Sequence, residues 1–218
     1  MKKRQSTIGL LPNPHLRILR KCGCIVTNGH FVLRDRTHSQ EYVNKDALYP
    51  HTSATAHVCV GLAQSFAGDN VEVVIGPSMG GIILAHGVAD YLTGIRRKEV
   101  LGLYAEKVPN SGEFVIRRGY DALLEGKRVL VVEDVAHTGE TVRRVIDSVL
   151  RHGGKVVGVG LLCLRGKLKP KELGVRKLKA LTVLDAPSFD EGNCPLCQTG
   201  VPINTDLGHG AEYVARKT

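Results

Sequence analysis

Apolar residues along this chain fall into two recurring patterns, short unbroken runs and runs with helical spacing. The runs at 71–75, 129–132 and 156–162 indicate strands that are covered on both faces, since such strands lose the alternation of a half-exposed sheet. Helical spacing predicts helices over 14–21, 52–66, 82–92 and 142–150. Thr52 or Ser53 is expected to cap the second of these helices.

The order of these elements predicts an α/β protein, because strands that alternate with helices form a parallel sheet with helices on both faces. Ligands bind beyond the carboxyl ends of the strands in such open sheets. The loops after Ile75, Val132 and Leu162 should therefore line one crevice. Further strands are expected at 100–105, 114–117 and 182–184, and short strands and loops within 31–46. A chain of 218 residues accommodates one such domain with a small appendage.

The segment from 129 to 150 is the most informative part of the chain. Its strand runs directly into Glu133 and Asp134, and a short loop rich in hydroxyl groups and glycine leads into the next helix. Backbone N–H groups at the start of a helix carry partial positive charge and bind phosphate. Two carboxylates beside such a cradle suit a polyhydroxylated, metal-bound sugar phosphate. This segment alone leaves a nonspecific phosphate loop, or a plain strand–turn–helix, as the alternative.

The same segment resembles the phosphoribosyl pyrophosphate signature of type I phosphoribosyltransferases. The resemblance implies that Glu133 and Asp134 hold the 2′- and 3′-hydroxyls of the ribose. It implies that the loop binds the 5′-phosphate through amides and hydroxyls of His137, Thr138, Gly139, Glu140 and Thr141. The chain departs from the family pattern at Ala136, at His137 and at Glu140, whose carboxylate would repel a phosphate unless it turns to solvent.

A second segment resembles the diphosphate loop of the orotate branch of this family. Small residues allow backbone amides to approach a diphosphate closely. The residues that the resemblance assigns to this loop are Ser78, Met79, Gly80 and Gly81. A glycine-rich turn between a strand and a helix is the alternative for this segment on its own.

Similarity to the orotate branch extends over nearly the whole chain, from residue 15 to residue 214. Arg34 lies in a segment similar to the N-terminal hood of that branch, where a basic residue faces the base and the diphosphate. Lys107 and Arg117 stand on the two sides of a flexible arm, which is shorter here. The resemblance assigns both to the diphosphate, with Lys107 as a mobile cation. Arg165 stands where the branch has an arginine against the orotate ring.

The fold that this resemblance implies is a parallel-sheet, Rossmann-like phosphoribosyltransferase core with helices on both faces and a small hood. Residues 1–50 are expected to form the N-terminal hood segment and residues 51–186 the core. Residues 187–218 are expected to form a C-terminal segment that joins the hood. A homodimer, in which the arm of one subunit covers the site of the other, is also implied.

The implied activity is a Mg²⁺-dependent transfer of the phosphoribosyl group of phosphoribosyl pyrophosphate to a nucleobase, with orotate as the first candidate. The reaction releases diphosphate and serves nucleotide biosynthesis or salvage, with Glu133, Asp134 and Lys107 as the catalytic residues. A purine or another heterocycle is an alternative base, because the hood and the arm depart from the orotate pattern. A non-catalytic regulator that senses phosphoribosyl pyrophosphate is a further alternative, favoured by Glu140 and the shortened arm.

Charge and hydropathy narrow the class of protein. The net charge of +9 favours anionic partners. The basic residues are scattered and lack the interleaved aromatic residues of single-strand binders, which argues against nucleic acid. No apolar run is long enough to span a bilayer, and the stretch at 8–11 is too short for a secretory signal. We therefore expect a cytoplasmic protein.

The six cysteines argue against a disulfide framework in a chain without a signal sequence. Cys59 and Cys163 fall within apolar patterns, which predicts that both are core residues. The Cys-x-x-Cys spacing of Cys194 and Cys197 resembles a zinc knuckle, whose turn directs two thiolates at one metal.

A second pair of thiols is available at Cys22 and Cys24. If the terminal segments meet in the hood, four sulfurs would form a structural Zn²⁺ site together with Cys194 and Cys197. His30 and His209 are other candidate ligands. Reduced thiols or a redox pair are the alternative.

Overall fold

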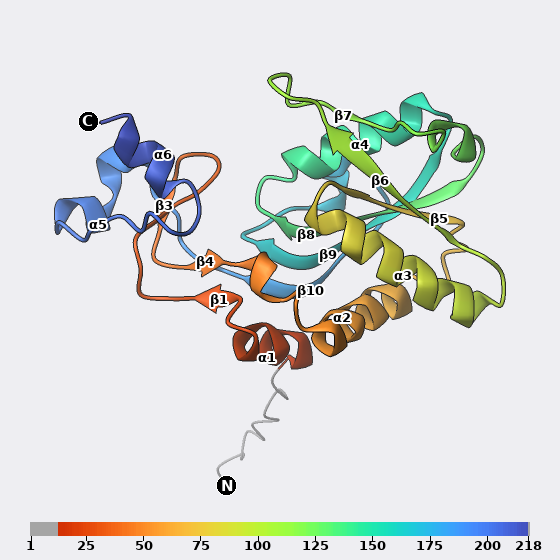
Figure 1. The fold of residues 1–218 in the computed structure, drawn as a ribbon, viewed down its shortest axis with the longest axis horizontal. Helices are drawn as coiled ribbons and strands as arrows, with labels where there is room; N and C mark the ends of the chain where they lie inside the picture. The colour runs from red at the N-terminus through yellow and green to blue at the C-terminus, as the bar shows by residue number, and fades with distance from the viewer. Residues whose placement is uncertain (1–12, 218) are drawn as a thin grey trace, which may run out of the picture.

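A computed structural model describes residues 13–217 and has a six-stranded sheet at its centre (Figure 1). The strand order is β10–β9–β8–β5–β6–β7, and all neighbours are parallel except β6 and β7. The strands are β5 (Val73–Pro77), β6 (Leu101–Lys107), β7 (Phe114–Val115), β8 (Arg128–Ala136), β9 (Lys155–Arg165) and β10 (Leu178–Leu184). The predicted α/β class with a mostly parallel sheet is confirmed.

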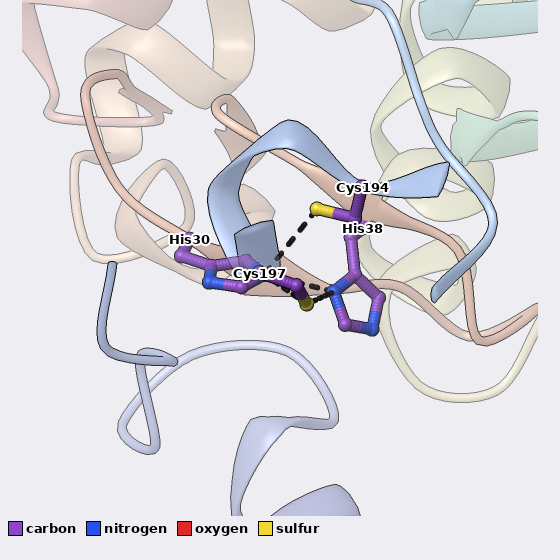
Figure 2. A group of neighbouring side chains, drawn as sticks. All are labelled: His30, His38, Cys194 and Cys197. Atoms are coloured by element: carbon purple, nitrogen blue, oxygen red, sulfur yellow. Dashed lines mark hydrogen bonds between the residues drawn. The ribbon is translucent and has the colours of Figure 1, made fainter. Parts of the chain in front are cut away.

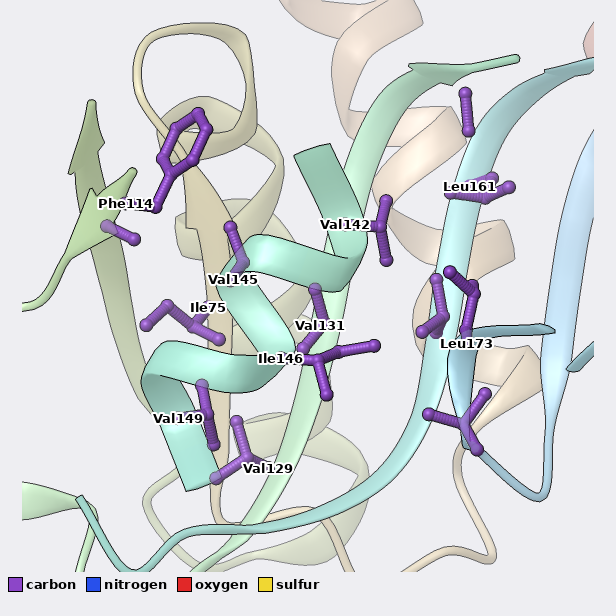
Figure 3. Packing of buried hydrophobic residues seen from close by; sticks show 14 of the residues in the cluster. Ile75, Phe114, Val129, Val131, Val142, Val145, Ile146, Val149, Leu161 and Leu173 are labelled. Atoms are coloured by element: carbon purple, nitrogen blue, oxygen red, sulfur yellow. The ribbon is translucent and has the colours of Figure 1, made fainter. Parts of the chain in front are cut away.

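Helices cover both faces of this sheet. They are α1 (Pro14–Lys21), α2 (Thr52–Ser65), α3 (Gly80–Arg96) and α4 (Glu140–Arg151), with short 3₁₀ turns at Lys45–Ala47, Asp121–Leu123, Pro170–Leu173 and Glu191–Asn193. Helix α4 lies on one face, where Val142, Val145 and Val149 pack against strand residues such as Val131 (Figure 3). Helices α2 and α3 pack on the other face around a second apolar cluster. This burial of apolar side chains on both faces explains the unbroken apolar runs in the strands.

Side-chain capping explains the start of α1 but not the starts of α2 and α3. Asn13 caps α1, because its side chain accepts hydrogen bonds from the amides of His15 and Leu16. The predicted cap of α2 is wrong: the helix already includes Thr52, and His51 precedes it without a side-chain hydrogen bond. Helix α3 begins two residues before the predicted start at 82, so its glycines form the first turn rather than a loop.

Strand β8 is longer than predicted. The expected end at Val132 is wrong, since pairing with β9 continues through Glu133 and as far as Ala136. Backbone hydrogen bonds extend the strand irrespective of side-chain polarity. Val129 and Val131 face α4, whereas Leu130 and Val132 face α2 and α3. Because side chains alternate along a strand, the two acids that follow leave the strand on opposite faces.

Two small antiparallel sheets and the C-terminal segment lie together at one side of the central sheet (Figure 1). Strand β1 (Ile25–Val26) pairs with β4 (Tyr42–Val43), and β2 (Phe31–Val32) pairs with β3 (His38–Ser39). The C-terminal segment contains α5 (Pro195–Gln198) and α6 (Gly210–Ala215). Backbone hydrogen bonds join His38 to Phe189, at 2.8 and 2.9 Å, and the amide of His209 to the carbonyl of Val32, at 2.9 Å.

Within residues 13–217, no helix is both long enough and apolar enough to cross a membrane. The apolar stretch at 8–11, on which the prediction about a secretory signal depends, lies outside the described residues.

Candidate active site

A cavity of about 550 Å³ lies at the carboxyl ends of β5, β8 and β9. Its position confirms that the loops after these strands line one crevice, as the strand order predicted. The predicted site residues that line it are Arg34, Ser78, Met79, Gly80, Lys107, Glu133, Asp134, His137, Thr138, Gly139, Glu140, Thr141 and Arg165. Residues from the small sheets and from the central sheet thus form one site.

Two predicted site residues do not line the cavity. Gly81 is buried in the first turn of α3, where a Cβ atom would lie 2.6 Å from Cδ of Pro77. It therefore allows the helix to approach β5. Arg117 is exposed beyond β7, and its neighbour Arg118 pairs with Glu106 at 2.5 Å. The predicted contacts of Gly81 and Arg117 with the diphosphate therefore stay predictions.

Asp134 is buried at the cavity wall and has several polar contacts. Its Oδ1 accepts a hydrogen bond from the amide of Val135 at 2.7 Å, and its Oδ2 accepts one from Tyr49 at 3.3 Å. The ammonium group of Lys45 lies 3.5 Å from Oδ2. Burial raises the pKa of Asp134, and the charge of Lys45 opposes that rise. Lys45 is the cation that compensates this carboxylate.

Fewer polar groups stabilise the charge of the Glu133 carboxylate than that of the Asp134 carboxylate. Only 6 % of Glu133 is exposed, and its Oε1 accepts a hydrogen bond from the amide of Asp134 at 3.1 Å. Burial, and next the charge of Asp134, raise the pKa of Glu133 well above its ordinary range. Two adjacent buried carboxylates with one nearby ammonium group form a site that favours a positively charged or metal-bound ligand.

The loop between β8 and α4 has the geometry of a phosphate cradle. Gly139 adopts a left-handed backbone conformation, with φ 74°, immediately before α4. The Oε1 atom of Glu140 accepts a hydrogen bond from Arg144 at 2.5 Å, and the side chain of Glu140 is 62 % exposed. Its charge is therefore paired and turned toward solvent. Arg34 adds a cation beside the loop, since it donates to Oγ1 of Thr141 at 3.1 Å.

The loop between β5 and α3 forms the opposite wall. Its Ser78–Met79 peptide bond is cis, and the backbone at Gly76 approaches Gly81 so closely that a Cβ at Gly76 would lie 2.3 Å from the carbonyl oxygen of Gly81. Helix α3 begins at Gly80, so the start of a second helix also faces the cavity. Its amides are available to an anionic ligand.

Arg165 is a buried cation in the wall of the cavity. Its exposed fraction is 5 %, and it donates one hydrogen bond, from Nη2 to Oγ of Ser39 at 3.0 Å. Its Nε atom is buried and has no hydrogen-bond partner among residues 13–217. The guanidinium gives the cavity wall a positive charge, which favours a ligand that carries a carboxylate or another anionic group.

Sequence reasoning did not predict the contacts that three residues make in the site. Lys45 and Tyr49 contact Asp134, although they are far from it in the sequence. Asp35 accepts a hydrogen bond from Nδ1 of His137 at 3.0 Å. This pair gives the unusual histidine a structural role, because Asp35 holds its side chain against the loop between β2 and β3. The pKa of Asp35 is lowered, since hydrogen bonds from Thr37 and the contact with His137 outweigh its burial.

The four predicted zinc sulfurs do not meet. Cys24 is buried in the apolar cluster beneath α2 and α3, and Cys22 packs against that cluster. Assigning these two to the metal site was therefore wrong. Cys194 and Cys197 instead lie beside His30 and His38 (Figure 2). His209, another candidate ligand, lines the cavity. Cys59 and Cys163 are buried, as predicted.

Comparisons with known proteins agree with this geometry. The phosphoribosyl transferase domain family matches residues 46–182. Orotate phosphoribosyltransferase of Pelotomaculum thermopropionicum is 40% identical over 85% of this chain and 91% of its own length. The corresponding protein of Desulforamulus reducens shows the same identity and the same coverage. The crystal structure of orotate phosphoribosyltransferase from Aeropyrum pernix matches with a TM-score of 0.60 and 27% identity, over 77% of this chain and 92% of that one.

Proposed function

Because this chain belongs to the phosphoribosyl transferase domain family, we propose that it is an orotate phosphoribosyltransferase of pyrimidine biosynthesis. In this reaction, the ring nitrogen of orotate forms a bond to the anomeric carbon of phosphoribosyl pyrophosphate, and the proton of that nitrogen is released to water. The carbon–oxygen bond to diphosphate breaks, and its electron pair leaves with the diphosphate.

The positive charge of Arg165 in the cavity wall is the observation that carries the choice of orotate. Orotate has a carboxylate that can pair with this guanidinium, whereas adenine, guanine and uracil have none. The relatives that share 40% of their residues with this chain are named for the same base.

The cavity supports specific roles for its residues. Glu133 and Asp134 would accept hydrogen bonds from the ribose hydroxyls and stabilise positive charge that develops at the anomeric carbon. The loop from His137 to Thr141 would bind the 5′-phosphate. Lys107 and the amides at the start of α3 would stabilise the leaving diphosphate. Catalysis would then depend on positioning and electrostatics, without a covalent intermediate.

The donor set of the cavity also fits Mg²⁺, a hard cation that prefers oxygen ligands and usually keeps several waters. Buried carboxylates with raised pKa values gain from a nearby positive charge, and both Glu133 and Asp134 are of this kind. These two residues would hold the ion, together with substrate oxygens. When bound, Mg²⁺ neutralises charge on the diphosphate as it leaves.

The activity is tested by incubating the protein with phosphoribosyl pyrophosphate, Mg²⁺ and one base at a time. We expect diphosphate release with orotate and not with adenine, guanine, xanthine or uracil. Release with a purine instead would contradict the assignment of the base. Heat from binding of phosphoribosyl pyrophosphate, without diphosphate release for any base, would favour a regulator that senses this metabolite.

The proposal extends to the organisation of the protein. Residues 1–50 and 187–218 would form the hood over a core of residues 51–186, in a cytoplasmic enzyme. Helix α3 exposes apolar side chains, among them Ile83 and Ile95, at 44% and 49% exposure. Association of two copies through this helix would bury these side chains, which favours a homodimer.

Light scattering after gel filtration is expected to give the mass of a dimer for the native protein and of a monomer for Ile83→Glu. The reason is that a carboxylate buried in an apolar interface pays a large desolvation cost. Exposed Leu150, on α4, supplies the control: Leu150→Glu should remain a dimer. A native protein that is monomeric at micromolar concentration would contradict the proposal.

A further inference from the structure

We propose that His30, His38, Cys194 and Cys197 bind one Zn²⁺ ion, which fastens the N-terminal hairpin to the C-terminal segment. One ligand atom from each of these residues lies within 4.8 Å of the other three. The pair of cysteines comes from the start of α5, and the histidines come from either side of the hairpin formed by β2 and β3 (Figure 2).

The distances match a tetrahedral site of two cysteines and two histidines. Bonds of about 2.0–2.3 Å to Zn²⁺ place neighbouring ligand atoms about 3.3–3.8 Å apart. Nε2 of His30 lies 3.7 Å from Sγ of Cys194 and 3.7 Å from Sγ of Cys197. Nδ1 of His38 lies 3.3 Å from Sγ of Cys197. The two histidine nitrogens lie closer together, at 2.8 Å, and would need to separate slightly.

The surroundings of His30 prepare it as a ligand. Its Nδ1 lies 2.7 Å from the carbonyl oxygen of Val201 and donates to it. In the neutral imidazole this hydrogen bond leaves Nε2 without a proton, and Nε2 faces Nδ1 of His38 at 2.8 Å and the two sulfurs at 3.7 Å. A backbone carbonyl in this position is a common outer partner of a histidine that binds a metal.

The charge of the site also suits Zn²⁺. Binding releases the thiol protons of Cys194 and Cys197, and two thiolates with two neutral imidazoles then balance the charge of the ion. His30, His38 and Cys194 are buried and Cys197 is partly buried, so the bound ion would be shielded from water. A site with four protein ligands is structural rather than catalytic.

The proposed Zn²⁺ site lies at the base of the hairpin formed by β2 and β3, so the ion would stabilise this hairpin. His30 and His38 flank the hairpin that brings Arg34 and Asp35 to the cavity wall. Ser39, the residue after His38, accepts the hydrogen bond from Arg165. Loss of the ion would therefore loosen the residues that position the ligand, and it should raise KM more than it lowers kcat.

The test is the metal content of the full-length protein, measured without substrate and therefore independent of the proposed activity. We expect about one Zn²⁺ per chain, and a thiolate-to-cobalt charge-transfer band after exchange for Co²⁺. Cys194→Ser and Cys197→Ser should lose both, whereas Cys22→Ser should keep both because Cys22 lies outside the cluster. His30→Cys supplies another zinc ligand and should restore binding that His30→Ala loses.

Three results would overturn the proposal. The first is a chain without Zn²⁺ after reduction and reconstitution. The second is equal loss of Zn²⁺ in Cys22→Ser and Cys194→Ser. The third is a disulfide between Cys194 and Cys197 in protein purified without reductant, which would appear as a loss of two hydrogens in the intact mass.

Discussion

Glu133→Gln is expected to lower kcat/KM roughly 10²–10³-fold and, at the same time, to raise the thermal stability of the ligand-free protein at neutral pH. The loss of activity follows from the loss of a negative charge beside the reacting sugar. The gain in stability follows because glutamine keeps the size of Glu133 and the hydrogen bond from the amide of Asp134 without burying a charge.

The stability gain should depend on pH with a defined sign. The folded protein raises the pKa of Glu133, so the stability of the native protein falls as pH rises through that pKa. Glutamine does not titrate, and the melting temperatures of the two proteins should therefore converge below about pH 4.5, the ordinary pKa of glutamate. Differential scanning calorimetry from pH 4 to pH 8 measures the difference.

Glu72→Gln is a control for which the expected change in stability has the opposite sign. The amide of Arg128 and the ammonium of Lys127 donate hydrogen bonds to its carboxylate and lower its pKa. Glu72→Gln should therefore reduce stability at neutral pH and leave activity unchanged. Native-like activity in Glu133→Gln, or a melting temperature that falls there as in Glu72→Gln, would contradict the assigned role of the acid pair.

Gly80→Ala is expected to reduce kcat/KM by roughly 10²-fold or more while the protein remains folded. A Cβ at this position would lie 2.0 Å from Oδ2 of Asp134 and 3.0 Å from the hydroxyl of Tyr49. The short Asp134 side chain can rotate away, which spares the fold but removes its carboxylate from the ribose. Steady-state kinetics and far-ultraviolet circular dichroism measure the two effects.

Gly94→Ala in the same helix is the matched control. This glycine is exposed, and a Cβ added to it would have no other atom within 4 Å, so alanine should fit without strain. Helix propensity then predicts a stabilisation of about 1 kcal/mol with unchanged activity. Equal activity in Gly80→Ala and Gly94→Ala would show that Asp134 does not need its observed position.

The sequence predicted those parts of the site that depend on short segments. Glu133, Asp134 and the loop before α4 are contiguous, so one strand and one helix start suffice to place them at the same edge of the sheet. Arg165 was assigned from the resemblance to the orotate branch, and the structure places it at the end of β9, beside β8. Local pattern and parallel topology together determine these positions.

The remaining features depend on contacts between distant segments. Lys45 and Tyr49 contact Asp134 from a distant part of the chain, and no local pattern signals that contact. The spacing of Cys194 and Cys197 was recognisable, but which residues lie opposite depends on how the hairpin at His30 and His38 meets the C-terminal segment. Cys22 has a thiol that could bind zinc, but it packs against the apolar cluster under α2 and α3.

The alternation along β8 gives the two acids different structural neighbours. Asp134 continues the row of Leu130 and Val132, on the side of α3, and Glu133 continues the row of Val129 and Val131, on the side of α4. A sugar held by both carboxylates would therefore bridge the two halves of the interior. Bound ligand should slow amide exchange in α3 and α4 together, although these helices lie on opposite sides of the sheet.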